Sequence, residues 1–289
     1  MLLIHTALSR EAKPVAARLG LRPEPLAASI RLYAGDDLFL VVSGTGSRRA
    51  AAAVGFALGL LHARHGRYPA ALNLGLCGAV GQGRESGGAF LINHCQAAAD
   101  GRRFVPDVLF RHRLREAGLH TFDHVVESED SLPRQFPRID LVDMEAAGFW
   151  EAASAFVPPS RVQSVKIVGD HLRDAPTVTP EDVEDRMRAA LPAVLDFIED
   201  FRRHLNTRNE SADPAGEAVL AAWAEALRLT ETQRHRLRDA VRFAALNGGG
   251  SAPERLGPPP AHPPSHKHER NRQFERLLEI LHESAHPSV

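Results

Sequence analysis

Three acidic residues lie where predicted strands end or predicted helices begin. Glu11 follows the first apolar run, Glu145 lies at the start of a helical pattern, and Asp170 follows the apolar run 162–168. Carboxyl groups in such positions can act as general acids or bases, or can accept hydrogen bonds from ligand hydroxyl groups. Each also has a structural explanation, because acids are favoured in the first turn of a helix and Asp is common in turns. Residue type alone leaves both interpretations open.

Two glycine-containing turns lie close to these acids along the chain. Residues 42–47 read V-S-G-T-G-S and precede an Ala-rich helical pattern, and residues 71–80 read A-L-N-L-G-L-C-G-A-V. Two glycines separated by one residue also occur in dinucleotide-binding loops, but the remainder of that fingerprint is missing here. The first turn alone is therefore weak support for any particular ligand.

Residues 1–205 alternate between short apolar runs and helical patterns. This alternation predicts an α/β fold with a mainly parallel central sheet flanked by helices, in which ligands bind at the carboxyl ends of the strands. The predicted strands are 2–7, 38–42, 70–74, 89–92 and 162–168, and the predicted helices are 10–18, 47–65, 107–117, 143–155 and 180–204.

The polar segment 206–211 predicts a boundary between a catalytic domain at 1–205 and a helical extension at 206–289. Within the extension we expect one helix at 214–229 and a second that opens with a capping box at residues 230–233. A Pro- and His-rich linker at 257–268 leads to a last amphipathic helix at 268–283. An apolar face on that helix must be covered by the main domain or by a second subunit; it consists of Phe274, Leu277, Leu278 and Leu281.

The segment 141–149, L-V-D-M-E-A-A-G-F, resembles the signature helix of the nucleoside phosphorylase and nucleosidase superfamily. The resemblance implies that Met144 packs on a ribose and that Glu145 accepts hydrogen bonds from the ribose hydroxyls. The segment 165–170, V-K-I-V-G-D, is similar to the buried strand of that family that ends in Ser-Asp or Gly-Asp. It implies that Asp170 donates a proton toward N7 of a departing purine, which requires a raised pKa or a proton held by a hydrogen bond.

The other matches follow in family order and are closest to the methylthioadenosine/S-adenosylhomocysteine nucleosidases. Residues 6–11 resemble their amino-terminal stretch, which implies that Glu11 helps to activate water as a general base. Residues 42–47 resemble their Ser-Gly-x-Gly turn, which implies that Ser43, Thr45 and Gly46 border the pocket of the nucleophile.

Asn73 indicates which nucleophile attacks. Hexameric phosphorylases have an Arg where Asn73 stands and a Ser where Leu76 stands, and both residues grip phosphate, whereas the nucleosidases have Asn at the first position. Without the charge-assisted contact of that Arg, phosphate should bind weakly. Hydrolysis is therefore favoured, although Arg48 or Arg49 could supply a charge from another direction, and Leu76 departs from both subfamilies.

The predicted base pocket departs from the family pattern. Residues 128–132, S-E-D-S-L, stand where the nucleosidases have Gly-Asp-Ala-Phe-Ile, so Ser131 replaces the aromatic residue that stacks on adenine. Phe104 and Phe122 are candidate replacements, although each also fits a place in the core. Adenine nucleosides modified at the 5′ position are the substrate class that the resemblance implies.

Composition limits the partners and cofactors that we expect. The formal net charge of -1 provides no field that would attract nucleic acid or a membrane surface. Cys77 and Cys95 form no CxxC pair and are expected to be buried free thiols, and the histidines after residue 260 have no metal-ligand spacing. We expect a small-molecule nucleoside as partner, no metal and no cofactor, a soluble cytoplasmic protein without a membrane span, and a homo-oligomer.

Two alternatives to the nucleosidase also fit the sequence. A phosphate-dependent nucleoside phosphorylase would use the same acids, and a nucleoside-binding regulatory protein would keep the fold without turnover. The unusual base pocket and the extension favour the regulatory protein, whereas the presence of Glu11, Glu145 and Asp170 argues against it.

Overall fold

The computed structural model divides the chain into two compact units, Met1–Leu205 and Asn206–Val289, which we describe separately. The residues described are 1–26, 30–81, 83–133, 139–172, 179–210, 214–230, 233–234, 236–238, 240–241, 256–260 and 262–283. Within this part of the chain, no helix is both long enough and apolar enough to cross a membrane.

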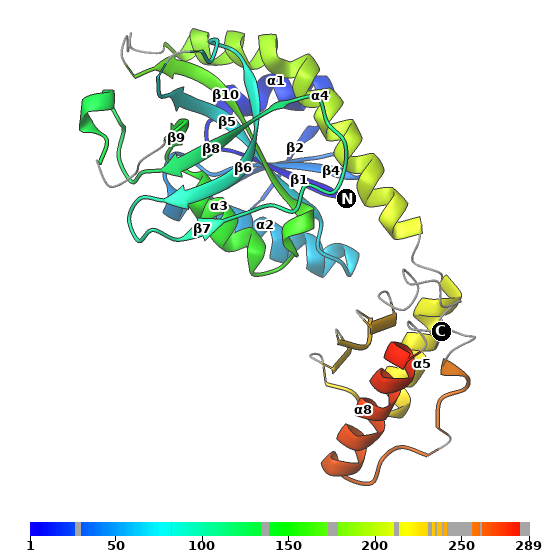
Figure 1. Ribbon diagram of the computed structural model, residues 1–289. Coiled ribbons are helices and arrows are strands. Elements are labelled where there is room, and N and C mark those ends of the chain that lie inside the picture. The colour runs from blue at the N-terminus through cyan, green and yellow to red at the C-terminus, as the bar shows by residue number, and fades with distance from the viewer. Residues whose placement is uncertain are drawn as a thin grey trace. The chain divides into compact units, whose positions relative to one another are not determined.

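The first unit is built on a mixed sheet (Figure 1). Among the described strands five neighbouring pairs are parallel and five are antiparallel, so the prediction of a mainly parallel sheet is wrong. Four of the five antiparallel pairs include β2, β3, β7 or β9, strands of two to four residues that are too short to show a hydrophobic pattern. The strands are β1 (Leu2–Thr6), β2 (Arg22–Glu24), β3 (Arg31–Ala34), β4 (Leu38–Val42), β5 (Ala70–Ala79), β6 (Ala89–Ala97), β7 (Arg103–Phe104), β8 (Arg115–Thr121), β9 (Leu141–Asp143) and β10 (Val162–His171).

Five of these strands close on themselves. β5 pairs with β10, β10 with β6, β6 with β8, β8 with β9, and β9 returns to pair with β5. The return is short, because Gly78 and Ala79 of β5 face Val142 and Leu141 of β9. This closure brings the end of β9 beside the ends of β5 and β10.

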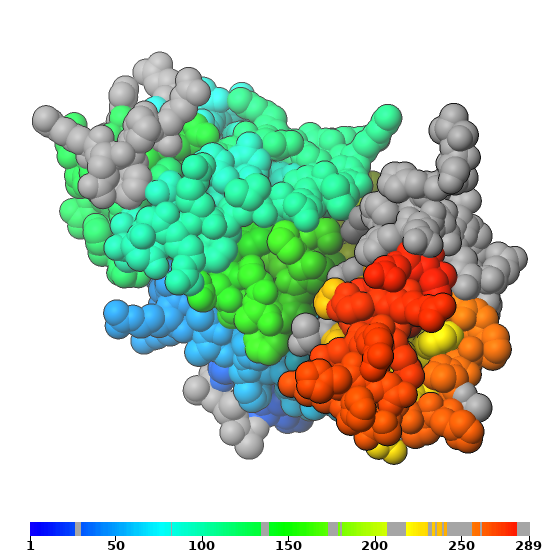
Figure 2. All heavy atoms as spheres, turned by 60° about the horizontal axis from the view of Figure 1, so that its bottom comes forward, coloured from blue at the N-terminus to red at the C-terminus, as the bar shows by residue number. Residues whose placement is uncertain are grey.

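Helices cover both faces of the sheet (Figure 1). α2 (Ser47–His65) and α3 (Ala146–Ser154) contribute to one buried apolar cluster with the sheet, and α1 (Ser9–Leu19) and α4 (Pro180–Glu210) contribute to another. Figure 2 views the side covered by α2, in light blue, and α3, in green. The predicted mixture of strands and flanking helices is therefore confirmed as an α/β fold.

Two helix predictions in this unit are wrong. Residues 107–117 do not form a helix, because β8 begins at Arg115 and pairs in parallel with β6. The helix predicted from Asp143 begins only at Ala146, since Asp143 ends β9 and its side chain accepts the Ala146 N–H.

The second unit contains α5 (Pro214–Ala226) and α8 (Lys267–Glu283). Thr230 and Gln233 form the expected capping box, in which each backbone N–H donates to the other side chain. The apolar face of α8 packs inside this unit, against Ala224, Leu227, Leu229 and Leu237. The expectation that the main domain or a second subunit covers this face is therefore wrong, and the face gives no support to a homo-oligomer.

Candidate active site

A cavity of about 290 Å³ lies where several elements of the first unit end. Its walls come from the residues after β1, the start of α1, the second half of β5, the β9–α3 junction and the end of β10. The predicted site residues Glu11, Thr45, Met144, Glu145 and Asp170 line it. Segments as distant in the sequence as those of Ala7 and Val183 thus meet at one site, mostly at the carboxyl ends of strands.

Glu11 lies at the third position of α1, where backbone N–H groups hold its carboxylate. Oε2 accepts the N–H groups of Ala7 and Leu8 at 3.0 and 2.9 Å, and Oε1 accepts the N–H of Leu76 at 2.9 Å. Burial raises the pKa of Glu11, and these three donors act in the opposite direction. The result is a carboxylate in a fixed position, suited to accept a proton from water.

Glu145 lies immediately before α3 and is also buried. Its Oε1 accepts the Gly46 N–H at 2.8 Å, so the glycine turn at residues 42–47 fixes the position of this side chain. Burial, together with the negative charge of Asp143, raises the pKa of Glu145 to about 7. Met144 lines the cavity beside it. The predicted pair therefore presents one apolar side chain and one carboxyl group to the same space.

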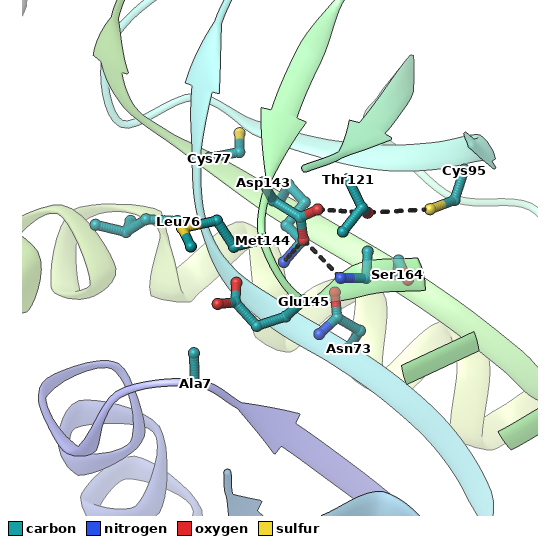
Figure 3. A network of polar contacts seen from close by, with 12 residues as sticks. Ala7, Asn73, Leu76, Cys77, Cys95, Thr121, Asp143, Met144, Glu145 and Ser164 are labelled. Carbon is teal, nitrogen blue, oxygen red and sulfur yellow. Dashed lines mark hydrogen bonds and ion pairs between the residues drawn. The ribbon is translucent and has the colours of Figure 1, made fainter. Parts of the chain in front are cut away.

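Asp143 and Lys166 form a buried ion pair that the sequence interpretation missed. Lys166 Nζ lies 2.8 Å from Asp143 Oδ2, while Thr121 donates to Asp143 Oδ1 at 2.6 Å (Figure 3). Thr121 in turn contacts the thiol of Cys95, with 3.5 Å between Sγ and Oγ1. A lysine inside the apolar run 162–168 is the sequence signal that points to this pair, because buried lysines are almost always paired.

Asp170 lies near the end of β10 and is half-buried. Burial raises its pKa, whereas Arg186 and His171 act in the opposite direction. Such a shift favours the protonated carboxyl group that a general acid needs. Close packing limits its position on one side, since a Cβ added at Gly78 would lie 3.1 Å from Asp170 Oδ1.

Ser43, Gly46 and Asn73 lie outside the cavity lining. Asn73 Nδ2 lies 2.8 Å from His5 Nδ1, and His5 Nε2 lies 2.8 Å from Ser43 Oγ. Burial lowers the pKa of His5 to about 3, so the ring is neutral, and it links β1 to β5 and to Ser43, the residue after β4, by hydrogen bonds alone. Ser43 and Asn73 thus face a structural cluster behind the site rather than the space in front of it.

The segment that borders the cavity at the expected base pocket is not the one that the sequence predicts. Ser131 belongs to a short 3-10 helix at Glu129–Ser131 that does not line the cavity, and His124, Val125 and Val126 line it instead. Neither Phe104 nor Phe122 lines it: Phe104 stacks on Trp150, and Phe122 is buried. Among the described lining residues the aromatic ring is that of His124, which contacts Phe122 edge-on with 5.9 Å between ring centroids.

The charge of the cavity wall is unbalanced. Three of its side chains are carboxyl groups, from Glu11, Glu145 and Asp170, and none of the described lining residues is Lys or Arg. Asp143 also borders the cavity, but its side chain is fully buried. Lys166 reaches Asp143 from inside the fold and does not line the cavity. The site therefore favours neutral or positively charged groups over anions.

Comparison with known proteins supports the fold. No family model and no curated protein matches the sequence. Among solved structures, a 5′-methylthioadenosine/S-adenosylhomocysteine nucleosidase from S. pneumoniae, crystallised with a transition-state inhibitor, superposes with a TM-score of 0.56 at 19% identity, covering 69% of this chain and 98% of that one. The corresponding enzyme from Neisseria meningitidis gives 0.55 at 16%, covering 70% and 98%. The 5′-methylthioadenosine nucleosidase of Arabidopsis thaliana gives 0.57 at 19%, covering 69% and 95%.

These similarities define the class of fold. The first unit has a nucleoside phosphorylase/nucleosidase-like fold, as the sequence motifs predict. At identities of 15–19% the likeness extends to the fold and not to the substrate.

Proposed function

We propose that residues 1–205 form a purine nucleosidase, which hydrolyses the N-glycosidic bond of a nucleoside and releases the free base. The observation that carries this proposal is the convergence of Glu11, Glu145 and Asp170 on one cavity. A binding protein needs neither a general acid nor a general base, so this convergence favours an enzyme over the regulatory alternative. Residues 206–289 are proposed to be a helical extension without a catalytic role.

Each residue has a distinct role in the proposed reaction. Asp170 donates its proton to the purine leaving group, and Glu11 accepts a proton from the attacking water. Glu145 accepts hydrogen bonds from the ribose hydroxyls, and Met144 packs against the sugar. The carboxylates around the sugar also stabilise the positive charge that develops on the ribose as the bond breaks.

Water is the proposed nucleophile rather than phosphate. Phosphate binding relies on Arg, Lys or backbone N–H donors, and the described cavity wall has the carboxyl groups of Glu11, Glu145 and Asp170 and no Lys or Arg. The same charges disfavour nucleotides with a 5′-phosphate. Asn73 supports hydrolysis only through the resemblance, since its side chain hydrogen-bonds to His5 rather than lining the cavity.

The proposed substrate is an adenine nucleoside with an uncharged 5′ substituent. Leu8 and Val125 contribute exposed apolar side chains to the cavity, 40% and 67% accessible, which suit such a group. A panel of 5′-modified adenosines tests the proposal, with free adenine measured for the wild type and for Asp170→Asn. We expect release by the wild type and a large loss in the variant. Equal activity in the variant would refute the assignment of Asp170, and tight binding without turnover across the panel would favour the regulatory protein.

A further inference from the structure

Lys166 is a buried cation to which the proposed reaction assigns no role. Its side chain is 2% exposed, within a strand whose first eight residues are all buried. Removing an ammonium group from water is unfavourable unless it is paired, and an apolar side chain at this position would avoid that penalty. The position therefore calls for an explanation beyond packing.

The groups that face Lys166 come from several elements around the site. Asp143 contacts it directly, while Glu145 and Glu11 are close enough to interact with its charge. The charge of Lys166 also lowers the pKa of three neutral groups: His5 on β1, Cys77 on β5 and Cys95 on β6. Lys166 is thus the cation at the centre of an otherwise acidic or neutral cluster among the described residues.

The ion pair is also anchored to the segment that carries the proposed ribose contacts. Asp143 Oδ2 receives both Lys166 Nζ at 2.8 Å and the Ala146 N–H at 2.9 Å, which fixes the turn Asp143–Ala146 at the entrance to α3. Met144 and Glu145 are the two residues inside that turn. A change at Lys166 is therefore transmitted to Glu145 by charge and by the backbone.

We propose that Lys166 is a positioning residue, which fixes the Asp143–Ala146 turn through its ion pair with Asp143 and favours the ionised form of the Glu145 carboxyl group, the form that binds ribose hydroxyls. This proposal rests on the proposed function only for the identity of the ribose hydroxyls. The two partners act on Glu145 with opposite sign, because the charge of Lys166 lowers the pKa of Glu145 and that of Asp143 raises it.

The proposal is tested by shifts of the pH profile in opposite directions in two variants. Lys166→Met should move the acidic limb of the kcat/KM profile for adenine release to higher pH, by about one unit or more, since a nearby opposite charge is lost. Asp143→Asn should move the limb to lower pH, and Lys166→Arg, which retains the charge, should leave it in place. Loss of activity in Lys166→Met and Asp143→Asn without movement of the limb, or movement in the same direction, would overturn the proposal.

A measurement that needs no turnover separates this proposal from the proposed function. Titration of the Glu145 carboxyl carbon by NMR in the full-length protein should show the same two opposite shifts, even for a protein that hydrolyses no nucleoside. Unchanged titration in both variants would contradict the role of Lys166, whereas shifted titration without adenine release would contradict only the nucleosidase. Should Lys166→Met fail to fold, Asp143→Asn and Lys166→Arg still give the contrast: a downward shift in the first and none in the second.

Discussion

The two ends of the cavity are built in different ways. At one end Glu11, Asp143 and Glu145 are buried, and among the described residues their carboxyl groups make seven short polar contacts: five with backbone N–H groups, one with Thr121 and one with Lys166. At the other end Asp170 is half-buried and the segment 124–126 is largely exposed. Catalytic groups held by backbone donors need no rearrangement when charge develops, so the first end is preorganised for the sugar and water. The second end leaves more room to adapt to the leaving group.

The largest effect is expected at the preorganised end. Glu11→Gln replaces an acceptor that receives three N–H groups by an amide with one oxygen, and it removes the proposed base. We expect kcat to fall by about 10²- to 10⁴-fold in a continuous assay of adenine release. Glu181→Gln, an exposed acid on α4, serves as the matched control and should retain activity. Comparable activity of the two variants would remove Glu11 from the mechanism.

A pair of glycines compares the rigidity of the two ends directly. A Cβ at Gly75 would lie 2.9 Å from Glu11 Oε1, which its hydrogen bonds hold in place, whereas a Cβ at Gly169 would meet the side chain of Leu76 at 3.3 Å. Because a small misplacement of a catalytic group can cost about 100-fold, Gly75→Ala should lower kcat/KM by about 10- to 100-fold. Gly169→Ala, beside Asp170, should cost much less, since no contact of its added Cβ is shorter than 3.3 Å. Equal losses would mean that the two ends are equally rigid.

The charge of Glu145 should appear in the pH profile. Its pKa of about 7 means that the carboxyl group gains a proton as the pH falls below 7, and a protonated carboxyl group accepts hydrogen bonds from hydroxyls less well. The kcat/KM of the free enzyme should therefore decline below about pH 7. Glu145→Gln should be less active and should lose this limb. Retention of the limb in the variant would assign it to another group.

The smallest effect is expected at the adaptable end. His124 supplies the aromatic ring of the cavity wall, and stacking of a base on an aromatic side chain contributes about 1–3 kcal/mol. If the His124 ring stacks on the base, His124→Ala should raise KM about tenfold with little change in kcat. Ser131→Ala, outside the lining, is the control and should change neither constant. A higher KM in Ser131→Ala, with no change in His124→Ala, would instead indicate that residues 128–132 form the base pocket.

The long, strongly patterned elements could be predicted from the sequence. The strand Leu38–Val42 and the helix Ser47–His65 have the predicted bounds, because each is a continuous run with a clear apolar pattern. β8 was mistaken for part of a helix, since its direction and pairing depend on β6 and β9 rather than on its own residues. The short strands β2, β7 and β9 carry too few residues for any periodicity to show.

The site was predictable where a motif fixes both residue and spacing. Glu11, Met144, Glu145 and Asp170 lie together around the cavity, although their catalytic roles stay predictions. Asn73 and Ser43 lie outside the cavity lining, and the sequence could not show this because the direction of their side chains depends on a distant partner, His5. His124 was missed for a related reason, since the segment that follows β8 reaches the cavity only through the closure of the sheet.

The central claim is that water, and not phosphate, is the nucleophile that attacks a nucleoside bound in this acidic cavity. The most direct measurement is the initial rate of adenine release from a 5′-modified adenosine with and without phosphate, with the sugar product identified by mass spectrometry. We expect a rate independent of phosphate and a free 5′-modified ribose as the product. Release that requires phosphate, with a sugar 1-phosphate as the product, would contradict it.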